Sequence, residues 1–228
     1  TPDGRRLIYR GTRAGHRNVY WRAVNGDGDE ERLSSGEGLQ TPGSLSPDGA
    51  TLIFMDTSPD GRRDFGMMRL DGDRTPRVVL KTPFSEFAPH LSPDGRWLAY
   101  SSTESGRSEI YARPFPGAGG RVTISTDGGS EPRWSRDGRQ LFYRSGEGMM
   151  AVTMTAGATP ATGSARLLFT GRYQVSDTAV SGYDVAPDGR FLMIESKAAP
   201  QSATQINVVL HWFDELTAAG TSSGPSPR

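Results

Sequence analysis

The sequence contains no cysteine, which excludes disulfide bonds and thiolate metal sites. It has no apolar run near the ~20 residues of a membrane-spanning helix, so we expect neither a membrane span nor a signal peptide within these 228 residues. Lys and Arg (26) balance Asp and Glu (26), and the basic excess of a nucleic-acid binder is therefore missing. We expect no nucleic-acid partner.

Glycine and proline, in contrast, are frequent and recur at regular places. One four-residue turn appears five times, as Thr1-Pro2-Asp3-Gly4, Ser46-Pro47-Asp48-Gly49, Ser92-Pro93-Asp94-Gly95, Ser135-Arg136-Asp137-Gly138 and Ala186-Pro187-Asp188-Gly189. The successive aspartates are 45, 46, 43 and 51 residues apart. Proline presets φ for such a turn, aspartate can bond back to the backbone, and glycine accepts a positive φ. The regular spacing indicates repeated structural units.

The clearest unit runs from Glu86 to Thr126 and has the pattern of four short strands. These expected strands are Glu86–Leu91, Trp97–Ser102, Glu109–Phe115 and Arg121–Ser125. A period in the forties with four strands per unit is typical of a propeller blade. We therefore predict an all-β fold, a β-propeller of four-stranded blades over residues 1–216, followed by a disordered polar tail at 217–228.

About five repeats are present, and the first and last are incomplete, because the first lacks an innermost strand and the last ends after its third. We expect a fragment of a larger ring, or a ring completed by strand exchange or oligomerisation. Open sheet edges attract other chains, so we predict a homo-oligomer formed through them.

The innermost strands of a propeller line its central channel, where ligands commonly bind. Their polar residues here are Thr41, Glu86, His90, Ser130, Glu131, Arg133 and Asp184. The interpretation that needs fewest coincidences is a hydrated funnel for peptide ends or sugars, without a cofactor. Alternatively, Glu86, His90, Glu131 and Asp184 form a catalytic set, in which the first three hold a divalent metal ion that activates water. For His90 itself, a strand histidine with satisfied hydrogen bonds is the simpler interpretation.

Several stretches resemble a known family. Repeats of the form SPDGRWLAYSS…SEIYARPFPG resemble TolB-like propeller repeats. KTPFSEFAPHLSPDGRWLAYSS, STDGGSEPRWSRDGRQLFYRSG and YDVAPDGRFLMI are similar to the C-terminal propeller of bacterial membrane-anchored serine/threonine protein kinases. The resemblance implies a preceding kinase domain and membrane anchor, with this region extracytoplasmic, either periplasmic or at the cell surface. No Gly-rich phosphate loop, HRD or DFG motif occurs, so kinase activity is not expected within these residues.

Two functions follow as hypotheses. The first is a non-enzymatic sensor or protein-interaction module of a receptor-type kinase, which binds a peptide, glycan or protein at the channel mouth. The second is a metal-dependent hydrolase of esters or phosphoesters with its site in the channel. Turnover of an activated ester, with and without a chelator, discriminates between them.

Overall fold

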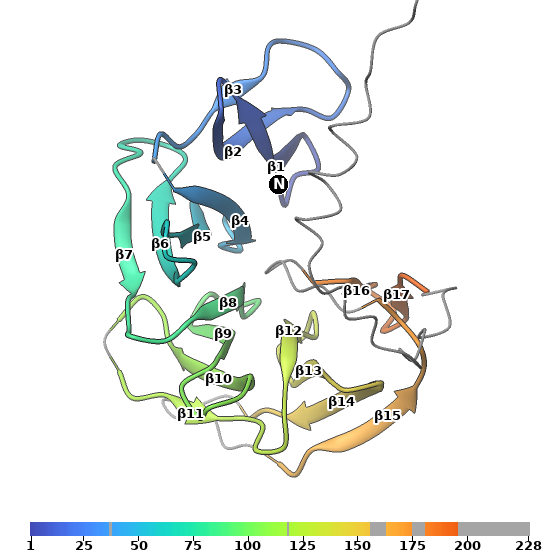
Figure 1. Cartoon of the computed structure of the whole chain (residues 1–228). Helices are drawn as coiled ribbons and strands as arrows, with labels where there is room; N and C mark the ends of the chain where they lie inside the picture. Colours follow the sequence, from blue (N-terminus) through green and yellow to red (C-terminus); the bar gives the residue numbers. More distant parts are fainter. Residues whose placement is uncertain (37, 118, 156–162, 175–180, 196–228) are drawn as a thin grey trace, which may run out of the picture. The chain divides into compact units, whose positions relative to one another are not determined.

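A computed structural model describes residues 1–36, 38–117, 119–155, 163–174 and 181–195, which belong to one compact unit, Thr1–Glu195 (Figure 1). The described residues form strands and turns and contain no helix. The strands are β1 (Arg6–Arg13), β2 (His16–Ala23), β3 (Glu31–Arg32), β4 (Leu39–Leu45), β5 (Thr51–Thr57), β6 (Arg63–Arg69), β7 (Arg77–Leu80), β8 (Glu86–Leu91), β9 (Trp97–Ser102), β10 (Glu109–Pro114), β11 (Val122–Thr123), β12 (Ser130–Trp134), β13 (Gln140–Ser145), β14 (Gly148–Thr153), β15 (Arg166–Thr170), β16 (Tyr183–Val185) and β17 (Phe191–Met193).

The strands form five antiparallel sheets in which sequence neighbours pair, and we call these sheets blades 1 to 5. Blade 1 is β1–β2–β3; blades 2, 3 and 4 are the four-stranded sheets β4–β7, β8–β11 and β12–β15; blade 5 is β16–β17. In Figure 1 the first strands of blades 2, 3 and 4 lie on the inner side of the row of sheets. The prediction of an all-β propeller with an incomplete first repeat is confirmed. The expected third strand of the last repeat and the tail at 217–228 lie outside the described residues.

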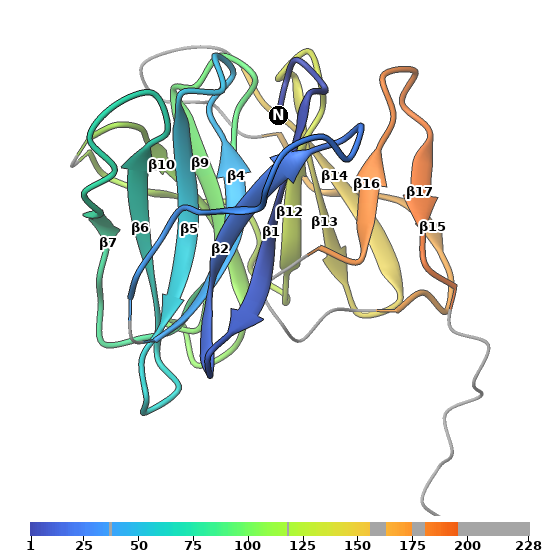
Figure 2. The same ribbon diagram turned by 90° about the horizontal axis from the view of Figure 1, so that it is seen from above.

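The repeated turn joins the inner strand of each blade to its second strand. In blade 3, Asp94 Oδ1 accepts hydrogen bonds from Ser92 Oγ at 2.5 Å and from the Arg96 N–H at 3.0 Å, and Gly95 has a φ of +71°. The hydrogen bonds from Ser92 and Arg96 outweigh the effect of burial and lower the pKa of the Asp94 carboxyl. Figure 2 shows these turns at one common end of the strands, which we call the turn face.

The hydrophobic core lies between the blades. Trp97 of blade 3 and Trp134 of blade 4 are buried in one cluster, while Tyr100 and Phe65 belong to the cluster between blades 2 and 3. Two further clusters join blade 1 to blade 2 and blade 4 to blade 5. Aromatic residues at repeated positions therefore pack blades together, as the repeat pattern predicts.

Each complete inner strand carries a β-bulge at the same repeat position. The pairing register shifts between Pro42 and Ser44 in β4, between Phe87 and His90 in β8, and between Ser130 and Arg133 in β12. Ala88 and Glu131, at the equivalent place, have positive φ values of 52° and 57°. A bulge re-aims the residue that follows it. Sequence alternation alone therefore misplaces side chains in this part of the strand.

The outermost strand of blade 3 is shorter than its sequence pattern predicts. The strand expected over Arg121–Ser125 is limited to Val122–Thr123, with additional backbone bonds from Ile124 and Ser125 to the Ile110 carbonyl. An outer strand has a partner on one side only, and the side chain of Ser125 instead accepts the Ile110 N–H at 2.8 Å.

Candidate binding site at the inner strands

Four inner strands present a residue at one equivalent position, which we call the ring position. Its members are Ser44, His90, Arg133 and Asp184. Ser44 Oγ accepts a hydrogen bond from the Leu91 N–H at 3.0 Å, and thus joins β4 to β8. In the same way, His90 Nδ1 accepts the Trp134 N–H at 3.3 Å and joins β8 to β12. The first two ring residues therefore connect neighbouring blades.

Burial of the imidazole, together with the nearby Arg133 guanidinium, lowers the pKa of His90 from 6.5 to about 3. The imidazole is therefore neutral at physiological pH, as its role as an acceptor at Nδ1 requires. The simpler interpretation of His90, a strand histidine with satisfied hydrogen bonds, agrees with this geometry.

Arg133 interrupts the series, because a guanidinium has no acceptor atom for the next strand. Its side chain is partly exposed and has no carboxylate partner in the part of the chain that the structure describes. Asp184, the next ring residue, is exposed. At the ring position, the residues of blades 2 and 3 therefore join neighbouring blades, whereas the residues of blades 4 and 5 carry accessible charges.

The two glutamates of the candidate set are buried. Glu86 is 1 % exposed; its Oε1 accepts hydrogen bonds from Thr82 Oγ1 at 2.6 Å and Ser102 Oγ at 3.4 Å, and burial raises its pKa. Glu131 is 2 % exposed; its carboxylate accepts the Gly182 N–H at 3.1 Å, and its carbonyl accepts the Tyr183 hydroxyl at 2.8 Å. Glu86 thus stabilises blade 3, and Glu131 joins blade 4 to blade 5.

The other two candidates also have structural contacts. Thr41 is buried and accepts a hydrogen bond from Arg10 Nη1 at 3.3 Å, and Ser130 lies opposite Arg144 in the β12–β13 pair. Among the described residues, no three His, Asp or Glu side chains are grouped as ligands of one metal ion. The structure therefore gives the metal-dependent alternative no assembled site within those residues.

A small cavity of about 30 Å³ lies between inner strands and is lined by Pro42, Pro89, Pro132, His90 and Arg133 among others. This volume accommodates only one or a few waters.

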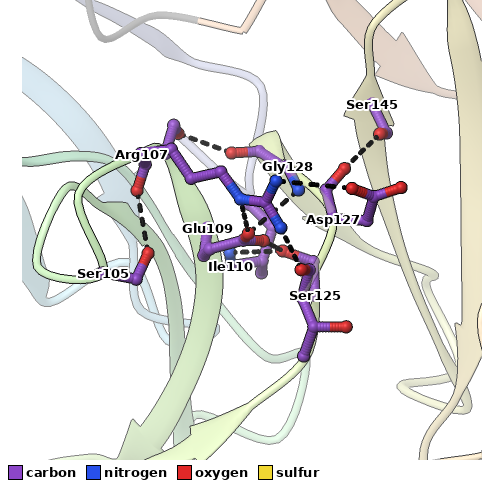
Figure 3. A network of polar contacts seen from close by, with 11 residues as sticks. Ser105, Arg107, Glu109, Ile110, Ser125, Asp127, Gly128 and Ser145 are labelled. Carbon is purple, nitrogen blue, oxygen red and sulfur yellow. Dashed lines mark hydrogen bonds and ion pairs between the residues drawn. The ribbon is translucent and has the colours of Figure 1, made fainter.

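A network of polar contacts around Glu109, at the start of β10, holds the connection that leads from blade 3 to blade 4 (Figure 3). Its Oε1 accepts hydrogen bonds from Arg107 Nε at 2.7 Å and the Gly128 N–H at 2.9 Å, and its other oxygen accepts Ser125 Oγ. These donors outweigh the effect of burial and lower the pKa of Glu109. This carboxylate was not among the sequence candidates, which were taken from the inner strands.

At the turn face, each turn packs against the preceding one. A methyl group placed on Gly49 would lie 3.2 Å from Pro2 Cδ, one on Gly95 would lie 3.3 Å from Pro47 Cδ, and one on Gly138 would lie 3.7 Å from Pro93 Cδ. The series stops at Gly189, where an added methyl group would meet nothing within 4 Å, and the preceding turn carries Arg136 in place of proline.

A cavity of about 680 Å³, the turn cleft, opens between the turns of blades 4 and 5. Its lining includes Phe142, Leu168, Phe191, Arg136, Arg139 and Asp188. The Phe142 and Phe191 rings meet edge to face at 5.0 Å. The turn cleft therefore combines apolar side chains with a charged rim, as peptide-binding sites commonly do.

The rim of the turn cleft has two free cations. Asp137 accepts hydrogen bonds from Ser135 Oγ at 2.7 Å and from the Arg139 N–H at 3.0 Å, and Asp188 pairs with Arg190 at 2.7 Å. Within the described ranges, the guanidinium groups of Arg136 and Arg139 have no carboxylate partner. The change from Ser-Pro-Asp-Gly to Ser-Arg-Asp-Gly is visible in the sequence. Only the structure shows that the packing of one turn against the next is interrupted at this place.

Comparison with known proteins identifies the family. The model of the TolB beta propeller domain matches residues 1–211, and the chain belongs to this family. An uncharacterized protein of Agrobacterium fabrum is 28 % identical over 158 residues, which cover 63 % of this chain and 52 % of that protein. The Tol-Pal system protein TolB of Thioalkalivibrio sulfidiphilus is 38 % identical over 63 residues, covering 27 % of this chain and 14 % of that protein. The chain thus spans about half, or less, of the length of these relatives.

Solved structures support the same fold. Crystal structures of TolB from Acinetobacter baumannii (TM-score 0.62, 21 % identity, 82 % of this chain and 45 % of that chain) and of a TolB candidate from Agrobacterium tumefaciens (TM-score 0.64, 18 % identity, 85 % and 71 %) are similar. At these identities the likeness shows the fold alone. No described residue belongs to a helix that could span a membrane.

Proposed function

We propose that this chain is a non-enzymatic protein-interaction module that binds an exposed peptide segment of a partner protein at its turn face. The turn cleft carries this proposal, because it is the one break in the turn-to-turn packing of the described blades. Leu168 and Phe191, which are partly exposed, offer an apolar surface, while Arg136 and Arg139 favour a segment that also carries a carboxylate.

The accessible charges at the ring position offer further polar contacts on the inner strands of blades 4 and 5. Arg133 and Asp184 are the ring residues without a joint to a following described strand. The other candidate residues take part in contacts that hold the blades together, and this favours binding over catalysis as the activity of the chain.

The resemblance to kinase-associated propellers supports a more specific role. In that role the module lies outside the cytoplasm and acts as the sensor of a receptor-type Ser/Thr kinase, so that ligand binding alters the proximity of kinase domains. Sequencing of the residues that precede this region in the intact gene tests it: a kinase domain and a membrane helix support the role, and their absence excludes it.

Selection from a phage-displayed random peptide library, followed by anisotropy with the selected peptides, tests the binding site. Arg136→Pro gives this turn the proline of the other turns and removes one cation from the cleft rim, so we expect at least about tenfold weaker binding with little change in the melting temperature. Arg139→Ala should weaken binding as well, whereas Arg96→Ala, at the equivalent position of blade 3, is the matched control. Equal binding by Arg136→Pro and the wild type would exclude the turn cleft. Chelator-sensitive turnover of an activated ester would contradict the non-enzymatic assignment.

A further inference from the structure

We propose that a cavity between blades 2 and 3, which we call the Met67 pocket, binds a small aromatic carboxylate. Its volume is about 220 Å³, and its lining includes Thr51, Met67, Arg69, Arg77 and Phe115. Blades 2 and 3 are both four-stranded sheets, so the pocket lies between two complete blades. It is separate from the turn cleft, which lies between blades 4 and 5.

The pocket lies where the neighbouring pairs of blades carry a tryptophan. Between blades 1 and 2, the buried Trp21 belongs to the third strand of its repeat, and Met67 has the equivalent place in blade 2. Between blades 3 and 4, the buried Trp97 belongs to the second strand, and Thr51 has the equivalent place in blade 2. Threonine and methionine carry no aromatic ring, so the space that an indole fills in the neighbouring pairs of blades is available to a ligand here.

The volume of the pocket fits one aromatic ring system with a short substituent. An apolar cavity of about 150 Å³ in a protein interior takes up one benzene molecule, whereas the pockets of drug-sized ligands measure about 300–1,000 Å³. The Met67 pocket, at about 220 Å³, lies between these limits. The expected ligand is therefore a small molecule and not a peptide segment.

The side chains of Met67 and Phe115 make one side of the pocket apolar. Both residues are partly exposed and pack against the core between blades 2 and 3. A bound ring would remove this apolar surface from water. The methionine sulfur and the phenylalanine ring also interact favourably with an aromatic ring, which favours an aromatic ligand over an aliphatic one of equal size.

A cation at the rim of the pocket favours a negative group on the ligand. Arg69 already holds Asp71, with Nε–Oδ1 at 2.8 Å and Nη2–Oδ2 at 2.6 Å. Arg77 is exposed and, among the described residues, has no carboxylate within ion-pair distance. Its charge acts from a distance on Asp73, whose carboxylate accepts the Thr75 hydroxyl at 2.6 Å. The Arg77 guanidinium is therefore available to a ligand carboxylate, which it can hold through two parallel N–H···O bonds.

The test uses indole-3-acetate as the probe and the NMR signals of ¹³C-labelled methionine methyl groups in the intact chain as the readout. We expect a saturable shift of the Met67 signal and an unchanged signal of Met150, which lies on β14 of blade 4. Indole, which lacks the carboxylate, should bind about tenfold more weakly, and Arg77→Ala should abolish this difference. Acetate, which lacks the ring, should leave the Met67 signal unchanged.

Variants that fill the pocket locate the bound probe. Thr51→Trp supplies the side chain that Trp97 provides in blade 3, and should abolish binding without lowering the melting temperature. Met67→Trp, which copies Trp21, is a second filling variant and keeps the test decisive if Thr51→Trp does not fold. Gln140→Trp places the same side chain at the equivalent position of blade 4, where it lines the turn cleft, and should bind indole-3-acetate as the wild type does.

Absence of a saturable Met67 shift would overturn the proposal, as would wild-type binding by the folded filling variants or equal binding of indole and indole-3-acetate. Loss of binding in Gln140→Trp with retention in Thr51→Trp would also overturn it, because the probe would then lie in the turn cleft. The peptide-binding function of the turn cleft is judged separately, since Arg136→Pro should bind indole-3-acetate as the wild type does.

Discussion

His90 Nδ1 accepts a hydrogen bond from the backbone N–H of Trp134. Trp134 is the last residue of β12, and its side chain is buried in the core between blades 3 and 4. The Trp134 indole N–H in turn donates to the His90 carbonyl at 3.2 Å. These two bonds, both donated by Trp134 and accepted by His90, join two inner strands. A histidine that resembles a metal ligand or general base in the sequence is therefore a contact between blades.

Replacement of His90 should lower the stability of the fold. His90→Ala removes the acceptor of the Trp134 N–H, and we expect a loss of about 1–3 kcal/mol in the free energy of unfolding. His90→Asn keeps an acceptor and should recover part of that loss. Urea unfolding measures both, with the exposed residue His16→Ala as control. A His90→Ala variant as stable as the wild type would contradict the role of His90 as a contact between blades 3 and 4.

Glycine is required in the repeated turn for a backbone reason. Gly95 has a φ of +71°, and a Cβ there would lie 3.3 Å from Pro47 Cδ. We expect Gly95→Ala to cost about 1–2 kcal/mol, because an L-residue is strained in the left-handed region. Gly72→Ala, whose Cβ would meet nothing within 4 Å, is the control. Thermal unfolding that ranks the two variants equally would refute this reason.

Glu109 should make the connection between blades 3 and 4 sensitive to acid. Its lowered pKa means that its stabilisation is complete above the usual glutamate pKa of 4.5 and is lost as the pH falls through the lower value of the folded state. Glu109→Gln should lose about 1–3 kcal/mol near neutral pH and show a weaker acid dependence. Glu147→Gln, at an exposed ion pair, serves as control. Identical pH–stability curves for Glu109→Gln and the wild type would argue against this role.

Replacement of Arg144, in contrast to that of Glu109, is not expected to lower the stability of the fold. Arg144 is 2 % exposed; among the described residues its Nε and Nη1 atoms have no hydrogen-bond partner, its Nη2 donates to the Gly146 carbonyl at 3.2 Å, and its guanidinium lies 5.7 Å from the centre of the Tyr173 ring. Arg144→Met should therefore leave stability unchanged or raise it, because the buried charge is poorly compensated. Arg107→Met should lower stability, since it leaves Glu109 buried without its cation. A large loss of stability for Arg144→Met in urea unfolding would show that the buried charge is well compensated.

The fold could be predicted from the sequence because its determinants are local and repeated. The turn around Asp94 and Gly95 fixes a strand-to-strand connection within four residues, and the period repeats it. The site could not be predicted in the same way. Bulges at Ala88 and Glu131 change which side chains point inward, and the partners of His90 and Glu109 lie in other parts of the chain.

The most direct measurement of the central claim, that inner-strand polar residues join blades, is the titration of His90 by ¹⁵N NMR of its imidazole. The account predicts an unprotonated ring with an accepting Nδ1 from about pH 8 to about pH 4, in agreement with a pKa of about 3. Between about pH 6.5 and about pH 3, His90 is protonated in the unfolded chain but not in the folded protein. The free energy of unfolding therefore declines as the pH falls through this range. A midpoint near 6.5, as for a solvent-exposed histidine, would contradict the account.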